Sequence, residues 1–135
     1  MEEQVKSLGV KLSWAFFAAF LLSGLLGFFP NPFLGEHGLF AANTGHNLVH
    51  IVSALAFLAV ARIGEKQSVL FMLGFGVLYA LIGLVGFAVT ADTSHGMLLG
   101  FIHINTFDNY LHIGLGAAIF AGGVFAKKSQ TMKAF

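Results

Sequence analysis

The sequence NTGHNLVHI, residues 43–51, returns 62 residues later as NTFDNYLHI, residues 105–113. A second element, GLLGF at residues 24–28, returns 59 residues later as GLVGF at residues 83–87. The chain therefore reads as two copies of one helical hairpin, over about residues 11–62 and 67–127. Because each copy would cross a membrane twice, the copies would share one orientation, related by an approximate two-fold axis along the membrane normal.

The composition around these repeats is typical of a membrane protein. Hydrophobic residues make up 57% of the 135 residues, charged residues only 10%, and the mean hydropathy is +0.84. A soluble domain carries about 25% charged residues. The charges leave four long uncharged stretches, each near the ~20 residues that a spanning helix needs. We predict helices at about 12–29, 44–61, 68–90 and 106–126, forming one all-α integral membrane four-helix bundle over residues 1–135.

The basic residues predict the orientation of this bundle. They fall in the N-terminal tail, the loop between the second and third helices, and the C-terminal tail: Lys6, Lys11, Arg62, Lys66, Lys127, Lys128 and Lys133. By the positive-inside rule, both termini and the middle loop are cytoplasmic, and the loops at 30–42 and 91–105 lie on the outer side.

Polar residues form one stripe on the second helix and one on the fourth. The spacing i, i+3, i+4, i+7 places each set on one helix face. Such a face cannot contact acyl chains, so both stripes are expected to face a common centre near the outer leaflet. The first stripe contains Asn43, His46, Asn47 and His50, and the second contains Asn105, Asp108, Asn109 and His112.

Two i, i+4 pairs within the stripes suggest a metal site. His46 with His50, and Asp108 with His112, would each direct two donor groups toward one ion, zinc, copper or iron. The four asparagines would support the ligands from a second layer. The remaining histidines, at positions 37, 95 and 103, are expected to be ordinary loop residues.

The same residues allow other interpretations. Asn43 or Thr44, and Asn105 or Thr106, are suited to capping helix N-termini, and Asp108 complements the dipole of the fourth helix. A purely structural hydrogen-bond network between helices could be formed by His46, His50, Asn47 and Asn109. His50 and His112 could contact a haem, a quinone or a pigment in an electron-transfer or photosynthetic subunit. Titratable groups at the centre could also serve a small channel or a proton-linked transporter.

Several classes of protein are disfavoured by what the sequence lacks. Without cysteine there are no disulfides, thiolate metal sites, iron–sulfur clusters or covalently attached c-type haem. No run of like charge indicates nucleic-acid binding. Catalysis has little support, since no Ser or Cys nucleophile accompanies Asp108 and His112. A binding or accessory role fits better, with membrane lipids and a second copy or a larger membrane complex as partners.

The segments GHNLVHI, VLYALIGLVGF and NTFDNYLHIGLG, beginning at residues 45, 77 and 105, resemble the bacterial membrane family known as domain of unknown function 4383. The resemblance covers nearly the whole chain and includes all eight stripe positions. It implies a four-helix protein of the cytoplasmic membrane of a bacterium and the same polar residues, and it brings no reaction, substrate or cofactor.

Overall fold

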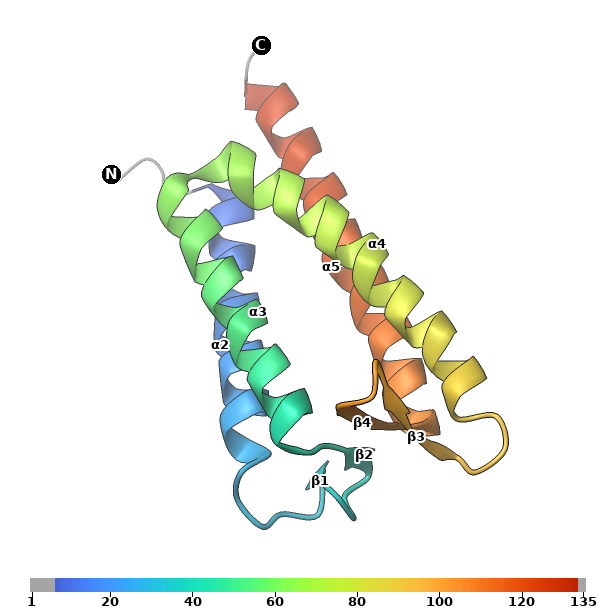
Figure 1. The fold of residues 1–135 in the computed structure, drawn as a ribbon. Helices are drawn as coiled ribbons and strands as arrows, with labels where there is room; N and C mark the ends of the chain where they lie inside the picture. Colours follow the sequence, from blue (N-terminus) through green and yellow to red (C-terminus); the bar gives the residue numbers. More distant parts are fainter. Residues whose placement is uncertain (1–6, 134–135) are drawn as a thin grey trace.

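Four long helices dominate residues 7–133, the part of the chain that the computed structural model describes. They are α2 (Leu8–Leu26), α3 (Thr44–Ile63), α4 (Glu65–Val89) and α5 (Thr106–Lys133) (Figure 1). Each is long and apolar enough to cross a membrane. The predicted helical class and the number of spans are therefore confirmed for these residues, and the helices indicate an integral membrane protein. Lys6 lies outside the described residues.

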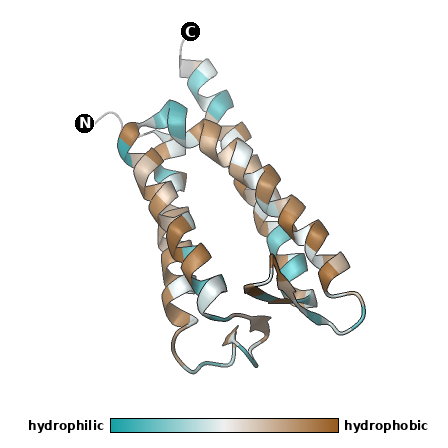
Figure 2. Ribbon diagram, viewed as in Figure 1, coloured by the Kyte–Doolittle hydropathy of each residue, from teal (hydrophilic) through white to brown (hydrophobic). Residues whose placement is uncertain are grey.

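The helices are arranged as two hairpins. Helix α2 packs along α3, and α4 packs along α5, whereas contacts between the two pairs are sparser. Figure 1 shows the hairpins approaching each other at the end that carries the chain termini and spreading apart toward the loops. Hydrophobic residues run along all four helices, as expected of surfaces that face lipid (Figure 2).

The turn between the hairpins is tighter than the sequence predicted. We expected a loop of several residues after position 61, but α3 continues to Ile63 and α4 begins at Glu65. Gly64 alone connects them, with φ at 141°, a conformation open to glycine and costly for other residues. The basic residues Arg62 and Lys66 consequently lie on the helix ends on either side of Gly64 rather than in a loop.

Glu65 ties the two hairpins together at this end. Its carboxylate oxygens each accept a hydrogen bond of 2.9 Å, from the backbone amides of Gly9 and Val10 in the first turn of α2. These amides have no partner within their own helix, so an acidic side chain from α4 provides the cap. The half of the bundle near the termini is then filled by apolar side chains, among them the fully buried Phe57, Met72 and Ile119.

Both loops at the opposite end contain short strands that the sequence analysis did not predict. Strands β1 (Leu34–Gly35) and β2 (Phe40–Ala41) pair in parallel, and β3 (His95–Leu98) and β4 (Ile102–Asn105) form an antiparallel hairpin. These two small sheets lie at the spread end of the hairpins (Figure 1). They bring backbone amides and carbonyls next to the first turns of α3 and α5.

Glycines of the repeated GLxGF element let the helices of each hairpin approach closely. A Cβ atom on Gly27 would collide with the side chain of Asn47, and one on Gly86 would collide with the side chain of Asn109. Within each hairpin, therefore, a glycine on one helix makes room for the stripe asparagine of the next. This is the small-residue packing that membrane helices use.

Candidate functional site

The first turn of α3 is bound to the second hairpin through Asn43. Its Oδ1 accepts hydrogen bonds from the backbone amides of His46, at 3.0 Å, and His103, at 3.2 Å. Its Nδ2 donates to the carbonyl of Phe101 at 3.0 Å. Asn43 is thus the predicted helix cap, and it also holds the β3–β4 hairpin against α3.

The first turn of α5 is bound to the first hairpin in the same way. Asp108 Oδ2 accepts from the amides of Asn105, at 2.8 Å, and Ala41, at 3.0 Å. Asn105 Nδ2 donates to the carbonyl of Leu39 at 2.9 Å. The carboxylate of Asp108 is therefore engaged with backbone amides. We call the bonds made by Asn43, Asn105 and Asp108 the cap network.

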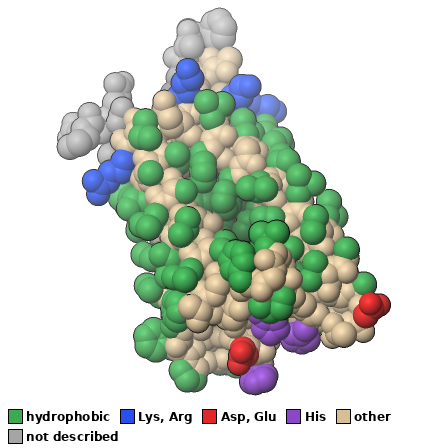
Figure 3. Space-filling view, in the orientation of Figure 1, with side chains coloured by type: hydrophobic (Ala, Val, Ile, Leu, Met, Phe, Trp, Pro, Cys, Tyr) green, Lys and Arg blue, Asp and Glu red, His purple; other side chains and the backbone are tan. Residues whose placement is uncertain are grey.

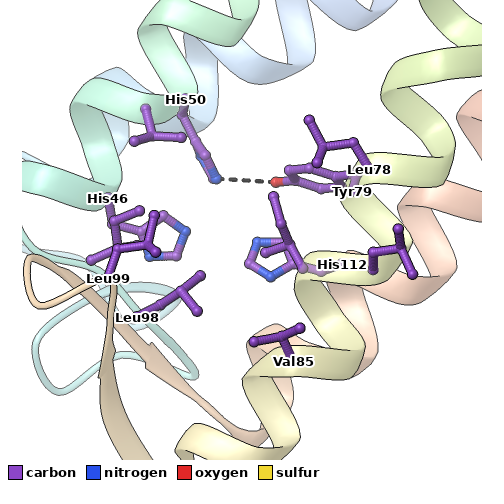
Figure 4. A pocket seen from close by; sticks show the side chains of 12 residues that line it. His46, His50, Leu78, Tyr79, Val85, Leu98, Leu99 and His112 are labelled. Carbon is purple, nitrogen blue, oxygen red and sulfur yellow. Dashed lines mark hydrogen bonds between the residues drawn. The ribbon is translucent and has the colours of Figure 1, made fainter.

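Three stripe histidines converge behind the cap network. His46 and His50 come from α3 and His112 from α5, and one nitrogen of each lies within 4.8 Å of the others. Among the described residues, this is the one group of three possible metal ligands so close together. His46 and His112 are each only 4% exposed. Figure 4 shows the three imidazoles directed toward one space between the hairpins. We call them the histidine cluster.

The backbone fixes the protonation of one member of this cluster. His46 Nδ1 lies 2.8 Å from the carbonyl oxygen of His103. A carbonyl can only accept, so Nδ1 must carry the proton, and in a neutral ring Nε2 keeps its lone pair. Metal-binding histidines are commonly oriented in this way, by donating from the other ring nitrogen to a carbonyl.

Tyr79 on α4 completes the cluster, and the sequence analysis did not include it among the site residues. Its hydroxyl is 3.3 Å from His50 Nε2, and its ring lies edge to face against His112 with centroids 4.6 Å apart. Its side chain is 4% exposed. A signal was present, because Tyr79 carries a hydroxyl in the middle of an otherwise strongly apolar helix.

The stripe asparagines 47 and 109 lie outside the cluster, against the glycines of the neighbouring helix. Asn109 Nδ2 donates to the hydroxyl of Thr90 at 2.9 Å. Three buried side-chain atoms have no hydrogen-bond partner among residues 7–133, namely Ser13 Oγ, Asn109 Oδ1 and His112 Nδ1. A buried polar atom without a partner is costly, so the one on His112 is a candidate contact for a ligand.

An apolar cavity of about 290 Å³ adjoins the histidine cluster. The three histidines and Tyr79 are its polar lining. Its other walls come from α3, α4 and the β3–β4 hairpin, and include Val49, Leu78, Ile82, Val85, Leu98 and Ile102. Leu78 and Val85 are 54% and 55% exposed, so the α4 wall of the cavity continues into the surface that faces lipid.

A separate group of titratable residues lies on the outer loops. His95 Nδ1 is 3.3 Å from His103 Nε2 across the β3–β4 hairpin. Partial burial and the neighbouring His95 lower the pKa of His103 below the ordinary 6.5, Glu36 acts in the opposite direction, and His37 adds to the lowering. Figure 3 shows His and acidic side chains at this end and Lys and Arg at the end with the termini.

We expect folding stability to fall as pH is lowered through this titration. The unfolded chain takes up a proton at position 103 near pH 6.5, whereas the folded chain does so only at lower pH. Because the unfolded state then binds more protons, acid favours unfolding. A ring-proton NMR titration should give His103 a pKa below 6.5, and His95→Gln should raise it. A value of 6.5 or above for His103 in the unsubstituted protein would contradict this account.

Comparison with known proteins identifies one family. Residues 11–125 match the family model described as Domain of unknown function (DUF4383). This match confirms the resemblance noted in the sequence, and it includes every residue of the cap network and the histidine cluster. No curated protein and no solved structure matches the chain.

Proposed function

This chain belongs to the DUF4383 family, and we propose that it is a small membrane protein that binds one transition-metal ion through His46, His50 and His112. The observation that carries the proposal is the convergence of three imidazoles from two helices of different hairpins. Imidazole nitrogens are preferred ligands of zinc, copper and iron. Three protein ligands leave a coordination position open, as in zinc sites that bind a further ligand.

The geometry supports three ligands rather than the four suggested by the spacing of the stripes. The donor nitrogens lie within 4.8 Å of one another. Small side-chain rotations would therefore place all three at the ~2.0–2.1 Å from a central zinc ion that zinc–nitrogen bonds require. Asp108 Oδ2 accepts from the amides of both Ala41 and Asn105, which favours a capping role for Asp108. His46 already lies with Nδ1 bonded to the backbone carbonyl of His103, an orientation common among metal-binding histidines.

The cluster geometry favours a single ion over a haem. The ring centroid of His46 lies 4.7 Å from that of His50 and 5.8 Å from that of His112. His46 and Tyr79 each contact both His50 and His112, so a macrocycle between those two imidazoles would have to displace them. A channel is also disfavoured, because the bundle half near the termini is closed by buried apolar side chains such as Phe57 and Met72.

We further propose that the two hairpins are duplicated copies in a parallel arrangement. The cap network supports this, because Asn43 binds the carbonyl of Phe101 and Asn105 binds that of Leu39, and both donor and acceptor pairs differ by 62 positions. The distribution of charge supports cytoplasmic termini and an external histidine cluster, in a bacterial cytoplasmic membrane (Figure 3). An accessory role in a homo-oligomer or larger complex fits so thin a bundle.

Elemental analysis of freshly purified protein tests the metal site. We expect about one zinc, copper or iron ion per chain, and almost complete loss in His112→Ala and in His50→Ala, because two imidazoles alone form a weak site. His37→Ala is the matched control, since His37 is exposed on the outer loop and apart from the cluster. Protein without metal, or full metal content in His112→Ala, would overturn the proposal.

A further inference from the structure

We propose that His95 and His103, which we call the cross-strand pair, form a second metal site that binds one zinc ion reversibly at the loop end of the bundle. This proposal goes beyond the proposed function, because it uses none of the residues of the histidine cluster. The sequence analysis expected both residues to be ordinary loop histidines. The antiparallel register brings them together, because it places His95 opposite Asn105, and His103 is the next residue on the same strand face.

The spacing of the two rings fits a shared ion. His95 Nδ1 lies 3.3 Å from His103 Nε2. Two nitrogens that each lie ~2.0–2.1 Å from a tetrahedral zinc ion are ~3.3–3.4 Å from each other. In the hydrogen-bonded pair, one of these nitrogens donates to the other. To bind zinc, the donating ring needs only to move its proton to its other nitrogen, and both rings stay neutral.

The backbone on both sides of the cross-strand pair is held in place. The amide of His103 donates to Asn43 Oδ1 at 3.2 Å, and its carbonyl is bonded to His46 Nδ1 at 2.8 Å. His95 lies in the paired strand β3, and its carbonyl accepts from Thr93 Oγ1 at 2.6 Å. Little main-chain freedom is therefore lost when the two rings bind an ion, and preorganised ligands of this kind favour binding.

The surroundings of the pair provide negative charge and access to water. His95 is exposed, and it lines an open hollow of about 540 Å³ together with Glu36 and His37. Glu36 is close enough to act electrostatically on His103. Its negative charge favours a cation at the two rings, and the open position lets the ion exchange with the solution. We therefore expect weak binding, and loss of the ion when the protein is dialysed.

Titration of zinc chloride into the full chain in detergent micelles, without a histidine tag, tests the site. The titration is done in the His112→Ala background, which removes one ligand of the histidine cluster. We expect saturable binding of about one zinc ion per chain by calorimetry, and zinc-dependent shifts of the ring protons of His95 and His103 by NMR. His95→Gln should weaken binding at least about tenfold, because only one imidazole of the pair remains.

Two variants of the loop before α3 test which groups take part. His37→Gln is the matched control and should leave the zinc affinity unchanged, since His37 is another exposed histidine beside the same hollow. Glu36→Gln should weaken binding about two- to fivefold at low salt and less at high salt, because it removes an exposed charge. Binding that does not saturate, or equal affinity in His95→Gln, would overturn the proposal. A loss in His37→Gln as large as that in His95→Gln would also overturn it.

Failure of this site is distinguishable from failure of the histidine cluster. The unsubstituted protein as isolated should give the same zinc affinity at the cross-strand pair as the His112→Ala background. Metal in the purified protein, without zinc binding at the cross-strand pair, overturns this proposal alone. Zinc binding at the cross-strand pair of a protein that is purified without metal overturns the metal site of the histidine cluster alone.

Discussion

Gly116→Ala is expected to destabilise the second hairpin by about 1–3 kcal/mol, the usual cost of overpacking a well-packed interface. Helices α4 and α5 touch backbone to backbone at this point. A Cβ on Gly116 would lie 2.5 Å from the Ala80 amide nitrogen and 2.7 Å from the Gly76 carbonyl oxygen. Neither atom can rotate away, so the helices must separate and lose packing on both sides of the crossing.

Gly114→Ala provides the control on the same helix. Its Cβ would have nothing within 4 Å, so this substitution should show only the gain in helix propensity that alanine brings over glycine, at most about 1 kcal/mol. Equilibrium unfolding in mixed detergent micelles, followed by circular dichroism, measures the free energy of unfolding of Gly116→Ala and of Gly114→Ala. Gly76→Ala should add little to Gly116→Ala, because the two changes disturb one contact. Equal free energies of unfolding for Gly116→Ala and Gly114→Ala would contradict the close crossing.

Asp108→Ala is expected to cause the second large loss of stability. The substitution leaves the backbone amides of Ala41 and Asn105 without their carboxylate partner, and both residues are buried, at 0% and 5% exposure. A buried group left unpaired costs about 1–3 kcal/mol, and more where the lost partner is charged. Because one of these amides belongs to the other hairpin, the loss should also loosen the loop end of the bundle.

Asp92→Ala is the matched control, since Asp92 is exposed on the loop after α4. It should leave the free energy of unfolding within about 0.5 kcal/mol of the unsubstituted value. Hydrogen exchange gives an independent readout, because the amide of Ala41 should exchange faster in Asp108→Ala and not in Asp92→Ala. If Asp108→Ala keeps full stability but loses bound metal, Asp108 would be a ligand rather than a cap.

The helices could be predicted from sequence because their determinants are local. Uncharged stretches of suitable length identified the four spans, and Asn43 and Asn105 marked where α3 and α5 begin. The bounds near Gly64 were wrong because the sequence analysis treated the flanking charges as a loop, whereas both charged residues continue their helices. The strands in the loops were missed because each is held by pairing within short segments that carry no long periodic pattern.

The candidate site could be predicted only in part. Helical spacing shows that His46 and His50 share a face, but it does not show how far that face lies from His112 on another helix. The same spacing gave Asp108 and His112 one face, yet the carboxylate is bound to amides of the loops, which are close only in the folded chain. Tyr79 was left out because it lies alone on α4. Its contact with His112 depends on how α4 packs on α5, and its contact with His50 depends on how the two hairpins meet.

The sequence by itself determined that this is a chain of four apolar helices, where polar stripes lie on two of them, and which family it belongs to. The helices and stripes follow from composition and local spacing, which act along the chain, and the family follows from the resemblance of the three quoted segments. Only the tertiary structure decided that three histidines meet beside a cavity while Asp108 and the cap asparagines bind the opposite loops. The physical reason is that the hydrogen bonds and van der Waals contacts of the site join residues from different hairpins, and their geometry is set by helix packing.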